Sequence, residues 1–198
     1  LQVIHNAADP LAALVDVYVN GALAVPSFAF RTATPFIDVP GDVVLNIGIA
    51  GAGSSGVNDT IVNFPITFAN GETYVAIANG VLTPANFAAN PDGRPTGFTL
   101  LIEQDIRESA INAGEVDFIV VHGATDAPTV DVKINGGGPI LVDNAAYSDI
   151  TPYLNVPAAS YTLDVTPGNN NNVIVATYLA DLTTLAGGSA VVFASGFL

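Results

Sequence analysis

Hydrophobic and polar residues alternate along the stretch from Val15 to Asn20, which reads Val-Asp-Val-Tyr-Val-Asn. Such alternation places one face of a strand in a core and the other face in water. Gly21 follows directly, and an Asn-Gly pair accepts the positive backbone angles of a tight hairpin turn. The pattern returns from Val130 to Gly136 as Val-Asp-Val-Lys-Ile-Asn-Gly. Two copies of one strand and turn predict a repeated architecture.

Three further blocks repeat in the same order, which indicates an internal duplication. They pair Val3–Asp9 with Val120–Asp126, Thr34–Pro40 with Thr151–Pro157, and Tyr74–Leu82 with Ala190–Leu198. The copies differ in length on both sides of the Asp-containing strand, in connections of the kind that tolerate such changes at a protein surface. The duplication therefore predicts two similar domains in tandem.

Short strand patterns separated by Gly, Pro and Asn residues fill the chain, and good helix formers are scarce. This is typical of an all-β protein. Strands are expected near 2–5, 15–19, 23–25, 34–39, 43–49, 60–68, 73–79 and 98–104, and then near 117–122, 129–134, 140–142, 153–156, 160–166, 173–179 and 190–195. We predict two immunoglobulin-like β-sandwich domains, residues 1–112 and 113–198.

The two copies end differently. After Leu82 the first copy continues through a Pro- and Gly-rich loop, 83–97, to the strand pattern at 98–104. The second copy reaches the matching position at Leu198 without a counterpart of that strand. A sheet without its edge partner exposes backbone donors and acceptors, which either a continuing chain or a neighbouring subunit can pair by strand addition. The expected assembly edge comprises Ala190, Val191, Val192, Phe193, Ala194 and Phe197.

Composition narrows the possible partners. The chain has 18 acidic residues against 4 basic ones, a formal net charge of −14, which disfavours binding to nucleic acid and to anionic membranes. It has no Cys, so disulfides and thiolate chemistry are excluded. No apolar run approaches the ~20 residues of a membrane span. Because the sequence starts directly in a strand pattern at Leu1, we expect a mature fragment or one segment of a longer secreted protein.

The two histidines, His5 and His122, occupy equivalent positions in the copies. With a neighbouring Asp in each copy they suggest a metal site, but one His per copy gives too few nitrogen ligands for zinc. Asp16 and Asp131 suggest a pair of acids, as in glycosidases, but residues duplicated with a domain more often serve its fold. We therefore expect a structural role for the repeated signature residues: His5, Asp9, Asp16, Asn20, Gly21, His122, Asp126, Asp131, Asn135 and Gly136.

Other chemistries find less support. Asn90–Gly93 and Asp38–Asp42 offer a few oxygen ligands for calcium but lack the dense acidic spacing of a strong site. No nucleophile elbow and no phosphate-binding glycine loop is present, so we expect neither an enzyme nor a cofactor. Tyr147 and Tyr153 match Phe30 and Phe36 and are expected in the core rather than against a sugar.

One modification site is expected. Asp59-Thr60-Ile61 fits an Asp-(Ser/Thr)-aliphatic pattern for O-glycan attachment, which makes Thr60 the candidate acceptor.

Val120 to Pro128 reads Val-Val-His-Gly-Ala-Thr-Asp-Ala-Pro, and Val130 to Gly136 follows it. These blocks resemble the family called domain of unknown function 4397 (DUF4397), whose repeats open in this way and continue as Val-Asp-Val-Tyr-Val-Asn-Gly. The first copy departs by an insertion before Val15. The resemblance covers most of the chain and implies an extracellular, immunoglobulin-like module of secreted or surface proteins of bacteria, with no established activity.

Two functions remain open at this point. One is a non-enzymatic cell-surface module, an adhesin stalk or filament subunit, whose partners are copies of itself or further domains of the same chain. The other is a carbohydrate- or cation-binding accessory module of a larger secreted protein, which would bind through the loops at 6–14 and 125–129. The absence of a reactive constellation and the missing final strand favour the first.

Overall fold

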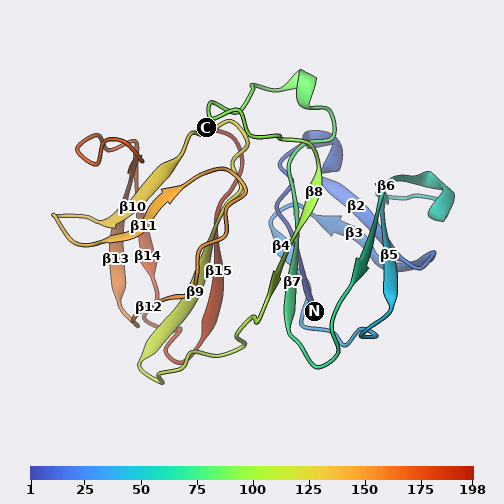
Figure 1. Cartoon of the computed structure of the whole chain (residues 1–198), viewed down its shortest axis with the longest axis horizontal. Coiled ribbons are helices and arrows are strands. Elements are labelled where there is room, and N and C mark those ends of the chain that lie inside the picture. The colour runs from blue at the N-terminus through green and yellow to red at the C-terminus, as the bar shows by residue number, and fades with distance from the viewer. The chain divides into compact units, whose positions relative to one another are not determined.

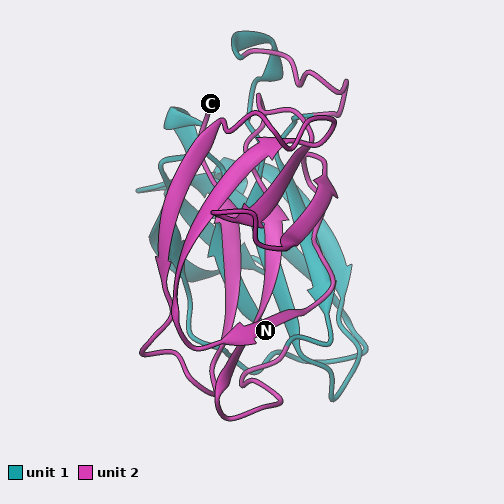
Figure 2. Cartoon of the chain, turned by 90° about the vertical axis from the view of Figure 1, so that its left-hand side faces the viewer, with its two compact units in different colours: residues 1–87, 96–106 teal, residues 88–95, 107–198 magenta.

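The computed structural model describes all 198 residues and contains fifteen strands and three single-turn 3-10 helices (Figure 1). No helix is long and apolar enough to cross a membrane. The chain forms two compact units, which Figure 2 shows in different colours. Unit 1 comprises residues 1–87 and 96–106, and unit 2 comprises residues 88–95 and 107–198. Each unit has two β-sheets, so the prediction of an all-β fold with two sandwich domains is confirmed.

Unit 1 has two four-stranded sheets. The first has the order β4 (Thr32–Ala33), β1 (Gln2–His5), β7 (Tyr74–Asn79), β8 (Thr99–Gln104), and the second has β3 (Ala22–Ala29), β2 (Leu14–Val19), β5 (Val44–Gly51), β6 (Thr60–Thr67). The 3-10 turns η1 (Pro10–Ala12), η2 (Val57–Asp59) and η3 (Pro84–Asn86) lie in the connections. β7 pairs in parallel with β1 on one side and antiparallel with β8 on the other.

Unit 2 repeats this arrangement with one strand fewer. Its four-stranded sheet has the order β11 (Ile140–Ala145), β10 (Val130–Ile134), β13 (Ser160–Pro167), β14 (Ala176–Asp181). Its three-stranded sheet has the order β12 (Leu154–Pro157), β9 (Glu115–His122), β15 (Ser189–Ala194). β15 takes the place of β7 and pairs in parallel with β9, but no strand takes the place of β8.

The cores follow the alternation in the sequence. In unit 1, Val15 and Val17 of β2 pack with Leu45, Ile47 and Ile49 of β5, while Phe98, Leu100 and Ile102 from the β8 segment pack against this cluster. In unit 2, Tyr147 is fully buried as expected, and burial raises the pKa of its hydroxyl to about 12. The core of unit 1 therefore forms between its two sheets.

The strand predicted at 34–39 is not formed. The structure has a two-residue strand directly before it, at Thr32–Ala33. Pro35 and Pro40 have no backbone N–H, so they cannot donate to a ladder. The segment nevertheless runs along β1, because Thr34 N–H donates to Val3 O at 2.9 Å and Ile37 N–H to Leu1 O at 2.8 Å.

The connection between the copies is fixed to unit 2. Residues 107–112 and the loop residues 88–95, which the sequence assigned to the first copy, belong to unit 2. Arg107 Nη1 lies 2.7 Å from Oδ2 of buried Asp117, and Ile111 N–H donates to the same oxygen at 3.1 Å. The carboxylate of Asp117 therefore holds the start of the connection to β9.

Candidate functional site

His5 has both ring nitrogens engaged. Its Nε2 donates to Ala12 O at 2.7 Å, and its Nδ1 accepts from Ala7 N–H at 3.3 Å. The ring is fully buried, and burial lowers its pKa. A neutral imidazole with both nitrogens occupied has no lone pair left for a metal. His5 thus fixes the loop after β1.

His122 fills the equivalent position in unit 2. Its Nε2 donates to Pro128 O at 3.0 Å, while its buried Nδ1 has no hydrogen-bond partner. No group of three or more His, Asp or Glu side chains in the structure lies close enough to hold a metal ion. The structure therefore does not bring the two histidines and the signature carboxylates together as a metal centre.

Asp16 and Asp131 bind the backbone of the neighbouring strand in their own unit. Asp16 Oδ1 accepts from Ser27 N–H at 2.8 Å, and Asp131 Oδ1 accepts from Asn144 N–H at 2.5 Å. Ser27 and Asn144 have positive φ angles of 47° and 54°, which turn their N–H groups toward the carboxylates. The two acids serve as anchors for a strand irregularity, one in each unit.

The second oxygens of these two acids differ. Asp16 Oδ2 accepts from the backbone and the hydroxyl of Ser54, and these bonds, led by the one from Ser27 to Oδ1, lower the pKa of Asp16. Asp131 Oδ2 is buried without a partner. The Gly-Ser loop of unit 1 reaches its acid, whereas the Asn-rich loop that replaces it in unit 2 does not.

Asp9 and Asp126 hold the end of the strand that returns beside their loop. Asp9 accepts from Leu11 N–H at 2.9 Å and from Leu82 N–H at 2.8 Å, and Asp126 accepts from Leu198 N–H at 2.9 Å. Leu82 and Leu198 are matching positions of the duplication. The bonds to Leu82 and Leu198 are therefore equivalent in the two units.

The hairpin turns after the repeated strand are not identical. Asn20 and Gly21 have φ angles of 50° and 84°, as a two-residue turn requires. In unit 2 the positive angles are at Gly136 and Gly137, and Asn135 instead donates from Nδ2 to both oxygens of Asp164.

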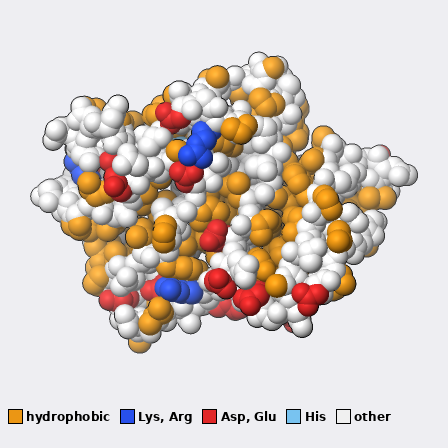
Figure 3. Space-filling view, in the orientation of Figure 1, with side chains coloured by type: hydrophobic (Ala, Val, Ile, Leu, Met, Phe, Trp, Pro, Cys, Tyr) orange, Lys and Arg blue, Asp and Glu red, His pale blue; other side chains and the backbone are white.

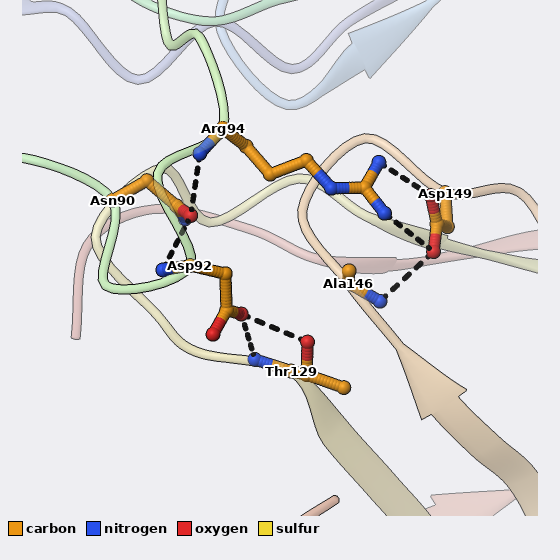
Figure 4. Close-up of polar contacts among 6 residues, drawn as sticks. All are labelled: Asn90, Asp92, Arg94, Thr129, Ala146 and Asp149. Carbon is orange, nitrogen blue, oxygen red and sulfur yellow. Dashed lines mark hydrogen bonds and ion pairs between the residues drawn. The ribbon is translucent and has the colours of Figure 1, made fainter.

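A group of polar contacts that the sequence did not reveal fixes the loop 88–95 to unit 2 (Figure 4). Asn90 is buried, donates from Nδ2 to Thr125 O at 2.9 Å and Ala127 O at 3.1 Å, and accepts from the N–H groups of Asp92 and Arg94. Because its partners lie 35 and 37 residues away, no periodic pattern marks it. Its only local signal is the Asn-Pro-Asp-Gly turn sequence.

The same loop has two further attachments. Asp92 Oδ2 accepts from the N–H of Thr129 at 2.6 Å and from its hydroxyl at 2.8 Å. Arg94 donates to both oxygens of Asp149, at 2.9 and 3.4 Å. The carbonyls of Thr125 and Ala127 are thus bonded within unit 2, as are Oδ1 of Asn90 and Oδ2 of Asp92 in the segment Asn90–Gly93 that was considered for calcium.

The apolar cavity between the sheets of unit 1 has a volume of about 50 Å³ and is lined by side chains such as Val17, Ile47 and Leu100. Pockets for small molecules usually measure at least roughly 300 Å³. The cavity is therefore a packing gap rather than a ligand site.

Thr60, the candidate for glycan attachment, begins β6. Its hydroxyl donates to Val57 O at 2.8 Å and accepts from Asn63 Nδ2 at 3.0 Å. Attachment at Thr60 stays a prediction, and a sugar-sized mass difference that disappears in Thr60→Ala would test it.

The assembly edge expected at β15 is the feature in which the two units differ most. Its counterpart β7 is buried at all six positions, whereas β15 is half-buried at four positions and exposed at Val192 and Ala194. Phe197, just after the strand, is also exposed. The remaining predicted edge residues, Ala190, Val191 and Phe193, are half-buried.

Backbone pairing shows which groups of β15 face outward. The carbonyl of Gly188 accepts from Asp117 N–H, and the carbonyl of Ala194 accepts from Gly123 N–H. The backbone groups of every second residue between them therefore also point toward β9. Strand geometry then directs the N–H and C=O groups of Val191 and Phe193 to the opposite side, where no strand lies. The matching groups of β7 pair with β8.

Side chains on the inner face of this edge are uncovered as well. Val192 is 42% exposed, whereas Ala76, at the same register in β7, is 1% exposed. Tyr178 of β14 is 61% exposed, although its counterpart Phe64 in β6 is half-buried next to Phe98, with ring centroids 6.2 Å apart. Figure 3 shows hydrophobic side chains on the surface over the region of β13 and β14.

Two comparisons with known proteins gave matches. A family model described as "Domain of unknown function (DUF4397)" matches residues 1–133 and again 116–198. Comparison with curated proteins gave no match. Among solved structures, "The Bacillus anthracis TIE protein" is matched with 10% sequence identity and a TM-score of 0.29, over 100% of this chain and 49% of that chain. The chain thus spans about half the length of that protein, and the low score establishes no common fold.

Proposed function

The chain belongs to the DUF4397 family, whose description assigns no activity, and from the geometry we propose that it is a structural module that assembles through strand addition. The observation that carries this proposal is the open edge at β15, with unpaired backbone groups at Val191 and Phe193 and exposed apolar side chains beside them. As the family resemblance implies, we place the module outside the cell, in a surface stalk, adhesin or filament.

The signature residues support a structural role. His5, Asp9 and Asp16 each bind backbone groups of neighbouring segments, and His122, Asp126 and Asp131 do so in unit 2. A catalytic group needs a free reactive atom near a site where a substrate fits. None of these contacts provides such a site, so we propose a non-enzymatic role.

The alternative role as a carbohydrate- or cation-binding accessory module has less support. Its second loop, 125–129, is already bonded by Asn90 and Asp92. Saturable binding to a glycan panel, lost in Thr129→Val but not in an outer-face control such as Leu179→Ser, would favour this alternative.

The experiment that tests assembly compares the unmodified chain with Val191→Pro and Val191→Thr. Proline removes the outward N–H without removing a bond to β9, whereas threonine keeps both the N–H and the β-branched shape. Electron microscopy and light scattering over a range of concentrations should show fibres or larger particles for the unmodified chain and Val191→Thr, and monomers for Val191→Pro. A chain that stays monomeric in all three forms contradicts the proposal.

A further inference from the structure

We propose that the open edge of unit 2 receives one extended strand from outside residues 1–198, antiparallel to β15, with uncharged apolar side chains at alternate positions turned toward β14. This inference rests on the proposed function, because it specifies the partner of the same edge. Here the open edge means β15 together with Tyr178 of β14.

The internal duplication supplies the template for this strand. In unit 1, β8 lies antiparallel to β7 in a register that pairs Ala76 with Ile102 and Ala78 with Leu100. Val192 occupies the position of Ala76, because each pairs with the matching residue of β9 or β1. A strand added in the same register would therefore place an Ile102-like side chain opposite Val192 and a Leu100-like one opposite Ala194.

The inner side chains of β8 show what this strand must cover. Phe98 packs beside Phe64, and Leu100 and Ile102 pack against the core cluster of unit 1. Tyr178 has the register of Phe64, because Tyr178 pairs with Leu163 as Phe64 pairs with Ile47. Tyr178 and Val192 are exposed at the place where β8 covers their counterparts.

The charge of the edge selects the chemistry of the incoming strand. Residues 189–194 carry neither charge nor proline, although natural edge strands are commonly protected by one or the other. The β8 edge of unit 1, by contrast, carries Glu103. In a chain with a net charge of −14, an edge without any charge suits a partner whose inward positions are apolar and uncharged.

Two other occupants fit less well. The β8 strand of the same chain is already paired with β7 at six positions. Two β15 edges could pair with each other through their backbones, but the inner side chains of both strands already face their own units. An added strand equivalent to β8 would instead cover Tyr178 and Val192, as the β8 segment covers their counterparts in unit 1.

A synthetic peptide with residues 97–105 of this chain (GFTLLIEQD) is the probe for the complete 198-residue protein. We expect saturable binding and slower amide hydrogen exchange at Val191 and Phe193. The peptide with Leu100→Asp and Ile102→Asp should bind at least about tenfold more weakly, because the carboxylates would be buried unpaired. Equal binding of both peptides, or unchanged exchange at Val191 and Phe193, would overturn the inference.

Variants of the protein localise the binding. Val192→Asp should abolish peptide binding, whereas Leu179→Asp, on the outer face of β14, should leave it unchanged. Circular dichroism establishes that both variants fold. If Val192→Asp does not fold, a chain with the peptide tethered after Leu198 by a flexible linker replaces it, and this chain should melt at a higher temperature than one with the Asp-containing peptide.

The outcomes separate this inference from the proposed function. Peptide binding by a chain that never assembles would support the strand site and contradict assembly as the function. Fibres that form without peptide binding, and that the peptide does not inhibit, would support assembly and overturn the inference. Inhibition of fibre growth by the native peptide alone supports both.

Discussion

Asp16 binds three donors from two segments that are distant in sequence, the backbone N–H of Ser27 and both the N–H and hydroxyl of Ser54. These bonds favour the ionised carboxylate and lower its pKa from an ordinary value of 3.8. A carboxylate with a depressed pKa in the folded state contributes stability above its unfolded pKa and loses it as the pH falls through the folded pKa.

We expect Asp16→Asn to lower the melting temperature of unit 1 at pH 7. The difference from the unmodified protein should shrink as the pH falls below about 4, because protonation then removes the same bonds from Asp16. Melting curves between neutral and acid pH measure this effect. The control is Asp38→Asn, which removes the same charge from an exposed position. A melting-temperature difference between Asp16→Asn and the unmodified protein that does not change with pH would contradict this prediction.

Asn90 offers a second test at this scale. Asn90→Ala leaves two buried carbonyls and two loop N–H groups without their partner, which should lower the free energy of unfolding of unit 2 by about 2 kcal/mol. Asn86→Ala, in the same loop but exposed, should change it by less than about 0.5 kcal/mol. Urea titrations compare the two, and equal effects would show that the loop does not stabilise the unit.

Among the elements, the connection into β9 is held by an ion pair between the partly exposed Arg107 and the buried Asp117. Arg107 pairs with Asp117 and lies over the ring of Tyr153, with 4.2 Å from its guanidinium carbon to the ring centroid. Breaking a buried pair costs most when the charge left behind is the buried one. The two partners therefore should not be equivalent in mutagenesis.

We expect Arg107→Ala to destabilise unit 2 more than Asp117→Ala, by about 3 against about 2 kcal/mol. Arg107→Ala leaves the buried Asp117 carboxylate without its cation, whereas the guanidinium left by Asp117→Ala still reaches water. Denaturant unfolding gives both values, and Asp117→Asn serves as the control of similar shape. The reverse order would mean that the ion pair does not govern this connection.

How far the sequence predicts an element depends on whether the element leaves a periodic pattern. β2 and β10 are visible because apolar and polar residues alternate in both copies, and the missing partner of β15 is visible because the first copy retains β8. The segment at 34–39 was expected as a strand as well, but Pro35 within it and Pro40 after it have no N–H to donate. The attachment of loop 88–95 depends on single polar contacts across 35 to 55 residues, for which a lone sequence carries no signal.

At the scale of the whole molecule, charge opposes association. Each 198-residue chain carries 18 acidic residues against 4 basic ones, a net charge of −14. Repulsion between copies is screened with a Debye length of about 10 Å at 0.1 M salt and about 3 Å at 1 M. Strand addition at an uncharged edge gains nothing from salt directly, so screening acts mainly on the approach of the copies.

Assembly should therefore proceed faster as sodium chloride rises from about 10 mM to about 0.5 M, with no requirement for a divalent ion. Light scattering against time measures the rate. Magnesium chloride at matched ionic strength is the control. A rate that falls with salt would indicate that ion pairs, rather than the apolar edge, hold the copies together.

The chain passes from unit 1 to unit 2, returns to unit 1 and enters unit 2 again, because residues 88–95 belong to unit 2 and lie between β7 and β8. The two units are therefore not formed by two consecutive stretches of the chain. If the chain is stretched, opening the β7–β8 pairing would pull on the contacts of Asn90, Asp92 and Arg94, so the unfolding of unit 1 would be transmitted to unit 2. A cut after residue 106 would likewise remove from unit 2 a segment that it needs, so the protein has no clean point of separation.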